Sequence, residues 1–234
     1  MTRRRVSNPL ALAVLGCLAE RPMHPYEIST TLRTRGKEKS IKLNYGSLYA
    51  VVDSLQKHGL IEPKETIRDG RRPERTVYAI TPSGYTEFED WLSELLAVPT
   101  REFTSLEAAL SLMGGLRPGE VARLLEERVG RLTIELRSDQ MMIDVTREQG
   151  VPDMFLVEGL LRIAMLEAEI RFVEQLVHDI RSGELPGVNT WSTLHDLLAD
   201  GHTPEEIFAD PVRYLGEEGR ALVDLPTFTP EPRT

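Results

Sequence analysis

The sequence is poor in cysteine, with Cys17 alone among 234 residues. A single cysteine excludes an internal disulfide framework and any zinc site made of four cysteines. Long hydrophobic runs are missing as well, since none approaches the roughly 20 residues that cross a bilayer. The basic start of the chain leads into Asn8 and Pro9 without the small-residue cleavage site of a signal peptide. We therefore expect a reduced, cytoplasmic protein without a membrane partner, in which Cys17 is a buried small hydrophobe.

Catalytic and metal-binding motifs are also missing. The five histidines are scattered and give neither a His-Glu-x-x-His pattern nor another close spacing for zinc. The sequence contains no Gly-x-Ser-x-Gly nucleophile turn, no Walker loop and no GxGxxG turn. We therefore expect no metal, no cofactor and no enzymatic activity.

The charge is unevenly distributed along the chain. Residues 1–85 contain 15 lysines and arginines against 8 acidic residues, a net charge of +7. Residues 86–234 contain 13 against 29, a net charge of −16. Such asymmetry indicates a polyanion-binding domain joined to a module with another task. Chance together with an acidic solvated helical surface explains the same numbers. The predicted fold is therefore needed to choose between these two interpretations of the charge.

Three short helices are expected at the start of the chain. Pro9 and Pro25 each stand where a first helical residue is favoured, ahead of apolar residues at helical spacing. The third helix is expected over residues 45–58, because its aliphatic residues share one face and Gly59 suits a left-handed C-terminal cap.

Two short strands follow these helices, at residues 60–67 and 75–80. The Asp-Gly pair between them predicts a hairpin, and Thr81 with the proline after it begins a fourth helix. This order of elements is that of a winged helix-turn-helix. We therefore predict a mainly α-helical protein with a small β-wing, in which residues 1–98 bind DNA.

The second half is expected to be helical throughout. Pro118 opens a helix that runs to Gln149, and Pro152 opens another that runs to Ser182, each about 31 residues or roughly 47 Å long. Their connection is so short that the helices must be antiparallel neighbours. The sequence thus predicts a coiled-coil-like helical hairpin within an α-helical dimerisation domain, residues 99–185.

Both long helices carry an apolar seam at alternating spacings of three and four. Asp139 stands where the first seam requires an apolar residue. The two helices can pack only on each other, but the second also carries Phe155 and Phe172 off its seam, and this surplus favours partner helices and a homodimer. The residues predicted for dimerisation are Ile163, Leu166, Ile170, Val173, Val177 and Ile180.

Residues 186–234 are predicted to form a helical tail with a frayed C-terminus. Thr203, Pro204 and Glu206 combine a capping box with proline at the first helical position. Short helices are expected near residues 193–198 and 204–215.

The third helix has the composition of a recognition helix. Small and hydrogen-bonding residues stand at its N-terminal end, while its aliphatic residues fall on the other face. The hairpin tip beside it carries four arginines, which suit the phosphate backbone. The DNA-contacting residues predicted on this basis are Asn44, Tyr45, Gly46, Ser47, Tyr49, Arg68, Arg71, Arg72 and Arg75.

Over about residues 8–90 the sequence resembles the PadR family of bacterial transcription regulators. Pro25 departs from the family's usual glycine at that place, which is the start of a helix and compatible with proline. Four segments carry the resemblance in order and spacing: His24-Pro25-Tyr26-Glu27-Ile28, Gly46-Ser47-Leu48-Tyr49, Leu55-x-x-x-Gly59-Leu60-Ile61 and Arg75-x-x-Tyr78-x-Ile80-Thr81-x-x-Gly84.

The resemblance implies a dimeric winged-helix repressor that binds double-stranded DNA at a palindromic operator and is released by a small-molecule effector. It adds Tyr26 to the helix-turn-helix residues. Tyr26 and Tyr49 are either DNA contacts or core aromatics, and Ser47 is a contact or a helix cap. Trp91 either lines an effector site or packs between the domains.

A second class of function stays open at this stage. A winged-helix fold can lose DNA binding and serve as a protein-interaction adaptor, with the acidic helical half as the binding surface. An adaptor of this kind is expected to lose the arginines of the hairpin tip. Because these arginines are present, the sequence favours the DNA-binding regulator.

Overall fold

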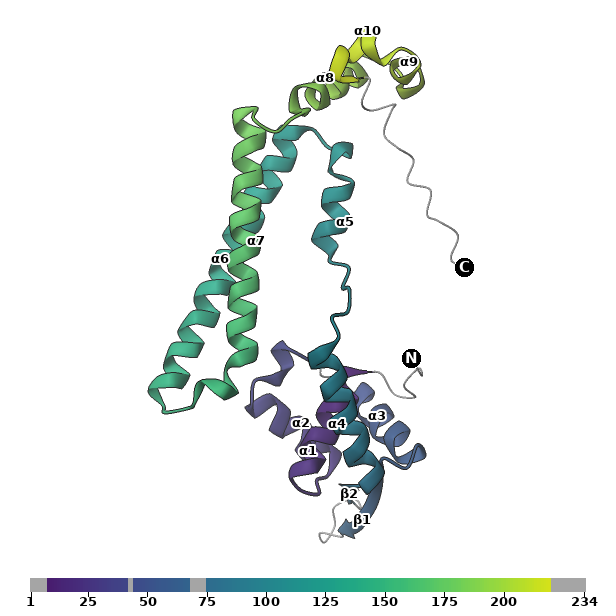
Figure 1. Cartoon of the computed structure of the whole chain (residues 1–234), viewed down its shortest axis with the longest axis vertical. Coiled ribbons are helices and arrows are strands. Elements are labelled where there is room, and N and C mark those ends of the chain that lie inside the picture. The colour runs from purple at the N-terminus through teal and green to yellow at the C-terminus, as the bar shows by residue number, and fades with distance from the viewer. Residues whose placement is uncertain (1–7, 42–43, 68–74, 220–234) are drawn as a thin grey trace. The chain divides into compact units, whose positions relative to one another are not determined.

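The computed structural model describes residues 8–41, 44–67 and 75–219. The chain divides into two compact units, Met1–Glu102 and Phe103–Thr234 (Figure 1). Among the helices of the described residues, none combines the length and the apolar composition that crossing a bilayer requires.

The first unit is a winged helix-turn-helix, as predicted from the sequence. Helices α1 and α2 precede the third helix, α3, which is followed by an antiparallel hairpin and a fourth helix. The bounds of these elements are α1 Pro9–Glu20, α2 Pro25–Thr34, the 3-10 turn η1 Lys37–Lys39, α3 Tyr45–Lys57, β1 Ile61–Ile67, β2 Arg75–Ile80 and α4 Pro82–Ala97.

The helices begin where side chains satisfy their first N–H groups. The Asn8 carboxamide accepts a hydrogen bond from the Leu10 N–H at 2.9 Å, and His24 Nδ1 accepts one from Tyr26 at 3.1 Å. In both helices the proline directly after the cap has no N–H to satisfy and a backbone angle suited to a helix.

The core of the first unit lies between α1, α2 and α3, and the start of β1 closes it. Leu15, Ile28 and Leu55 are fully buried there and Ile61 nearly so. Cys17 is also buried, and its burial raises the pKa of the thiol. This thiol is therefore a packing group, as expected.

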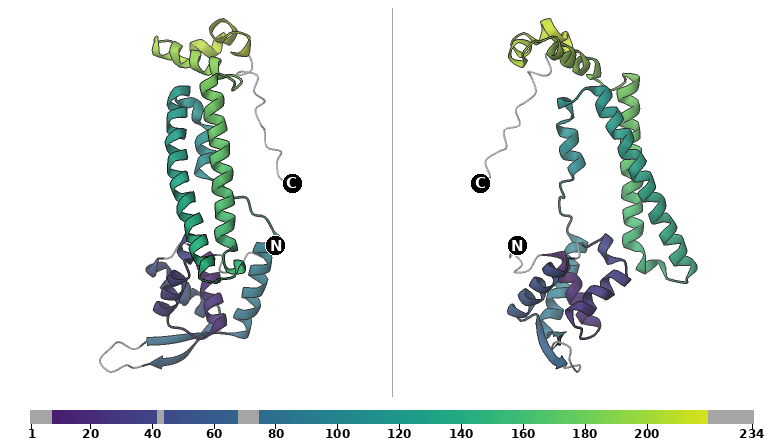
Figure 2. Two further views of the ribbon diagram at one scale, coloured as in Figure 1. Left: turned by 90° about the vertical axis from the view of Figure 1, so that its left-hand side faces the viewer. Right: turned by 180° about the vertical axis from the view of Figure 1, so that it is seen from behind.

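The two strands form a hairpin, called the wing here, that projects beyond the helices (Figure 2). The register pairs Ile61 with Ile80, and a β-bulge lies between Pro63 and Glu65. Met23 extends the sheet on its other edge, because it exchanges two backbone hydrogen bonds of 3.0 Å with Tyr78. The wing is thereby tied to the segment that precedes α2.

A joint between Gly59 and Gly84 connects the end of α3, the base of the wing and the start of α4. Gly59 ends α3 with φ +72°, the left-handed conformation expected from the sequence. The Thr81 hydroxyl donates to the Gly59 carbonyl at 2.7 Å and accepts the Gly84 N–H at 3.0 Å. A Cβ atom at Gly84 would lie 2.0 Å from the Leu60 carbonyl oxygen, so only glycine fits.

The second unit is helical throughout its described part. Helices α6 and α7 form an antiparallel hairpin and the remaining elements are short. Their bounds are α5 Ser105–Ser111, η2 Met113–Gly115, α6 Pro118–Glu148, η3 Asp153–Phe155, α7 Val157–Ser182, α8 Val188–Ala199, α9 Pro204–Ala209, α10 Pro211–Leu215 and η4 Glu217–Gly219.

The prediction that the second long helix begins at Pro152 is wrong by five residues. Pro152 is extended, and a single 3-10 turn separates it from α7, which has 26 residues. Arg147 holds this turn through two hydrogen bonds to the Asp153 carboxylate, at 2.8 and 2.9 Å. Each tail helix predicted around residues 193–198 and 204–215 is present, the second as the pair α9 and α10.

Helices α6 and α7 pack against each other through their apolar seams, with one charged exception. Asp139 occupies a seam position and is 2% exposed. Its carboxylate accepts a hydrogen bond of 2.5 Å from Arg162 Nε on α7. Because an unpaired buried carboxylate is costly, this pair favours one register of the two helices.

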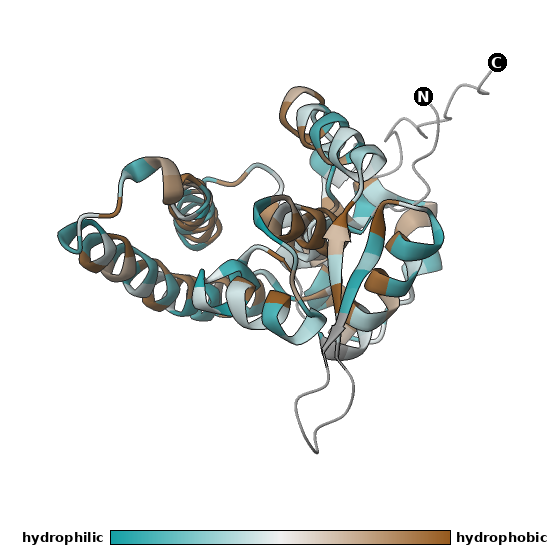
Figure 3. Ribbon diagram, turned by 90° about the horizontal axis from the view of Figure 1, so that it is seen from below, coloured by the Kyte–Doolittle hydropathy of each residue, from teal (hydrophilic) through white to brown (hydrophobic). Residues whose placement is uncertain are grey.

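Both long helices are apolar on two opposite faces. One face of each is the seam inside the hairpin, and the other is exposed. Apolar and polar residues alternate along the ribbon of the long helices (Figure 3). The exposed large apolar residues are Leu124, Ile134, Met141, Met142 and Val145 on α6, and Val157, Leu161, Met165 and Phe172 on α7.

We predict that Gly84→Ala lowers the free energy of unfolding of the first unit by about 1–3 kcal/mol, because the new methyl group meets a backbone carbonyl that cannot rotate away. Gly46→Ala is the matched control, since the nearest atom to its Cβ is 3.6 Å away. It should change stability by less than about 1 kcal/mol. Urea unfolding followed by circular dichroism measures both, and equal stability of the two variants would contradict the role of the joint.

Candidate nucleic-acid interface

Helix α3 has one face inside the core and one face in solvent. Leu48, Val51, Val52 and Leu55 are 7% exposed or less and hold the helix against the rest of the first unit. Ser47 and Tyr49 lie on the other face and are exposed. The helix is therefore anchored by its aliphatic residues while its polar N-terminal residues face outward, as the sequence predicts for a recognition helix.

The N-terminal end of α3 is arranged to receive an anion. Asn44 is the N-cap, and its side-chain oxygen accepts the Gly46 N–H at 2.9 Å. The following N–H groups and the positive end of the helix dipole are directed toward solvent. Among the described residues, the atom nearest to a Cβ built at Gly46 is the Asn44 side-chain oxygen at 3.6 Å. Packing within this described part of the chain therefore does not require glycine there, and the absence of a side chain leaves the backbone accessible.

Tyr26 and Tyr49 are surface residues. Their side chains are 56% and 47% exposed, so neither is a core aromatic. Tyr26 stands in the first turn of α2, two residues after the His24 cap, and Tyr49 in the second turn of α3. Both hydroxyl groups are open to a partner such as a phosphate oxygen.

Part of the predicted interface lies outside the described residues. Arg68, Arg71 and Arg72 belong to the segment 68–74 at the tip of the wing, which the structure does not describe. Arg75 begins β2 and pairs with Ile67 through its backbone. For Arg75 and Tyr45 the backbone is placed and the side chain is not described.

Ion pairs brace the helices behind this surface. Arg35, the C-cap of α2, donates to both carboxylate oxygens of Glu20 at the end of α1, at 2.5 and 2.7 Å. These hydrogen bonds hold the pKa of the Glu20 carboxyl below its usual value. Arg21 pairs with Glu27 at 2.5 Å. The arginines of α1 and α2 thus serve the geometry of the helix-turn-helix.

Trp91, predicted as an effector contact or a packing residue, lies in the core of the first unit. Its side chain is 4% exposed and contacts the cluster that contains Leu15 and Leu55. An indole enclosed in this way has no face open to a flat ligand, and Trp91 does not line either cavity described below.

The residues predicted for dimerisation pack inside the chain. Leu166, Ile170, Val173 and Ile180 are buried, and Ile163 and Val177 are half-buried, all on the face of α7 that contacts α6. A second apolar stripe lies on the opposite face of α7, where Val157, Leu161, Met165 and Phe172 recur at helical spacing. The sequence indicated surplus apolar residues off the seam, Leu161 and Phe172 among them, but the dimer contacts were predicted at the seam instead.

One group of side chains among the described residues has the spacing of metal ligands. Ligand atoms of His178, Asp179 and Glu184 lie within 4.8 Å of one another at the end of α7. His178 and Glu184 are exposed, and the Asp179 carboxylate accepts a hydrogen bond of 2.7 Å from Gln175. An open arrangement of this kind is common on acidic protein surfaces.

Comparison with proteins of known structure identifies the fold. Bacillus subtilis PadR, solved in complex with operator DNA, superposes with a TM-score of 0.61 at 18% identity, over 74% of this chain and 99% of the other. The same protein solved with p-coumaric acid gives 0.61 at 16% identity, over 74% and 98%. The Vibrio cholerae virulence activator AphA gives 0.57 at 16% identity, also over 74% and 98%. At these identities the likeness shows the fold.

The sequence comparison is more specific for the first unit. No curated protein matches the chain as a relative. Residues 14–90, which contain the helix-turn-helix and the wing, match the profile of the Transcriptional regulator PadR-like family, a family of regulators and not of enzymes. The match covers about a third of the chain, and together with the shared fold it makes the first unit similar to the PadR-like transcriptional regulators.

Proposed function

We propose that the protein is a sequence-specific DNA-binding repressor that acts as a dimer and is relieved by a small-molecule effector. The observation that carries the proposal is α3, whose aliphatic face is buried while Ser47 and Tyr49 are exposed at its N-terminal half. The match of residues 14–90 to a family of transcriptional regulators supports the same proposal.

In the proposed complex α3 enters the major groove with its N-terminal end. Ser47 and the N–H groups near Gly46 bind phosphate or base-edge acceptors, and Asn44 and Tyr45 flank them. The hydroxyl groups of Tyr26 and Tyr49 donate hydrogen bonds to phosphate oxygens of the DNA. Arg68, Arg71, Arg72 and Arg75 of the wing neutralise phosphates beside the groove.

We propose that the dimer forms through the exposed apolar stripe of α7. Its members Leu161, Met165 and Phe172 are 56–62% exposed in the single chain, so a row of large apolar side chains faces water. A second copy would cover them, and two recognition helices about 34 Å apart, or a multiple of this distance, would read a palindromic operator.

The effector is proposed by analogy. Bacillus subtilis PadR has been solved both with operator DNA and with p-coumaric acid. A regulator of the same fold is therefore proposed to respond to a small molecule, whose chemistry these two complexes do not define for this chain.

Ser47→Glu should weaken binding to the DNA upstream of its own gene by roughly 100-fold or more, because a carboxylate at this place faces phosphates and base acceptors. Gln56→Glu is the matched control, since it adds the same charge at the far, exposed end of α3. A mobility shift with competitor DNA measures both. Absence of any shift with the unmodified protein would favour the adaptor, and normal binding by a folded Ser47→Glu protein would exclude α3 from the groove.

Replacing Arg71 and Arg72 of the wing with alanine should weaken binding to all DNA sequences alike. Each lost phosphate contact should make the log–log dependence of affinity on salt shallower by roughly one unit. The affinity is measured by fluorescence anisotropy at several salt concentrations. An unchanged slope would remove the wing from the interface.

Leu161→Glu with Met165→Glu should give a folded monomer whose operator affinity is about 10²–10⁴-fold lower, because the two half-sites are no longer linked. Light scattering gives the mass and circular dichroism the helicity. The charge exchange Arg171→Glu with Glu174→Arg is the control on the polar side of α7. Ile170→Asp should instead unfold the hairpin, since it buries a charge inside the chain. A stable dimer with both glutamates would place the interface elsewhere.

A further inference from the structure

The second unit contains a cavity of about 460 Å³ where the tail meets the start of α6. Gly114 of η2 and Gly187 before α8 form part of its wall, and Pro186, Trp191 and Leu194 supply the apolar side chains. The volume lies within the range of small-molecule sites, roughly 300–1,000 Å³. Residues from three separate elements, η2, α8 and η4, line it.

The walls of this cavity are held by hydrogen bonds between distant parts of the chain. Trp191 Nε1 donates to the Leu116 carbonyl at 2.8 Å, which fixes the indole against the residues before α6. His195 Nε2 lies 2.9 Å from the Gly114 carbonyl oxygen. Arg117 donates to Asp196 at 2.6 Å and to the His195 carbonyl at 3.1 Å. Helix α8 is thus fastened beside the cavity, so that the indole is in place before a ligand arrives.

The charge of the cavity is negative. Among the described residues that line it, Glu218 alone is ionisable, and its Oε2 accepts a hydrogen bond of 2.6 Å from the Thr190 hydroxyl. Thr190 is 7% exposed, so this bond fixes one side of the carboxylate from within the protein. The nearby Arg117 guanidinium is engaged by Asp196. The surplus of acidic residues over residues 86–234 adds to the negative potential.

A cavity with these properties selects its ligand by charge and shape. An indole face attracts flat apolar molecules and is also favourable to a cation. A carboxylate at the cavity wall attracts a protonated amine and repels an acid. We propose that this cavity binds a small organic cation, a flat apolar molecule that carries a protonated amine.

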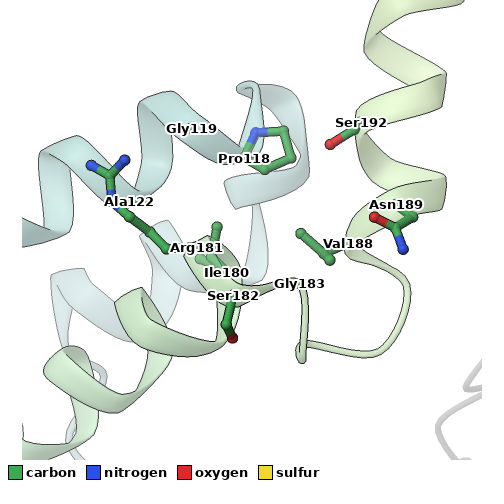
Figure 4. A pocket seen from close by; sticks show the side chains of 10 residues that line it. All are labelled: Pro118, Gly119, Ala122, Ile180, Arg181, Ser182, Gly183, Val188, Asn189 and Ser192. Carbon is green, nitrogen blue, oxygen red and sulfur yellow. The ribbon is translucent and has the colours of Figure 1, made fainter.

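Another cavity among the described residues of the second unit lacks these features. It measures about 370 Å³ and is lined mainly by small residues such as Pro118, Ser182 and Ser192 (Figure 4). The one arginine beside it, Arg181, donates to both carboxylate oxygens of Glu126 at 2.8 Å, so its charge is already matched. This cavity therefore serves as an internal comparison.

The inference goes beyond the proposed function and does not depend on it, because ligand binding is measured on the protein without DNA. The probe is 9-aminoacridine, and acridine-9-carboxylate is its counterpart with the same ring and the opposite charge. Isothermal titration of the full-length protein should give a dissociation constant on the order of 100 µM or tighter for the amine. The acid should bind at least about 10-fold more weakly.

Three variants locate the site. Glu218→Gln should weaken binding of the amine by about 3–10-fold and remove most of the difference in affinity between the amine and the acid. Glu205→Gln removes an equal charge from an exposed position on α9 and should change the affinity for neither ligand. Leu194→Trp should fill the cavity and reduce binding of the amine by at least about 10-fold, with helicity unchanged by circular dichroism. No binding of the amine at 1 mM, equal binding of both ligands, or indifference to Glu218→Gln and Leu194→Trp would each overturn the proposal.

Discussion

The close contact between Gly84 and the Leu60 carbonyl is the constraint on which the arrangement of α3 and the wing depends. Helix α3 ends three residues before Leu60, the wing begins one residue after it, and Gly84 in the first turn of α4 lies against it. Thr81 bonds to both sides of this contact through one hydroxyl group. This contact between backbone segments, together with the two Thr81 hydrogen bonds, restricts the angle between α3 and the wing. A DNA-binding domain needs this rigidity, because its base contacts depend on phosphate contacts that fix the position of the domain on the duplex.

The long hairpin solves a different problem, since a pair of helices has too little interior to be a globular core. Helices α6 and α7 use one apolar face each for the seam and keep a second apolar face exposed. Asp139 and Arg162 place a charged pair inside the seam, where an apolar pair would be at least as stable. Such a pair is unfavourable in any shifted register, so it favours one alignment of the hairpin over its neighbours. The outer stripes then present a defined surface.

The sequence predicts most of the fold, because local chemistry decides it. Proline and polar caps mark the helix starts at Pro9, Pro25 and Pro82, and Gly59 marks the end of α3. The start of α7 was misplaced, because the pair of Arg147 with Asp153 is a contact that spacing alone does not reveal. For the candidate site the exposed end of α3 follows from helical periodicity. The burial of Trp91 and the cavity beside Trp191 do not, because both depend on elements that meet only in three dimensions.

The distribution of charge assigns the two units unequal parts in DNA binding. Residues 1–85 carry a net charge of +7, whereas residues 86–234 carry −16 and are repelled by phosphate. This acidic charge disfavours contact between the second half of the chain and phosphate. A single recognition helix with a wing seldom reaches the affinity of about 10⁻⁸ M expected of a specific regulator. In the proposed dimer the acidic unit raises affinity by joining two DNA-binding units through its exposed apolar stripe. The same negative potential that excludes DNA from this unit favours cations in its cavity.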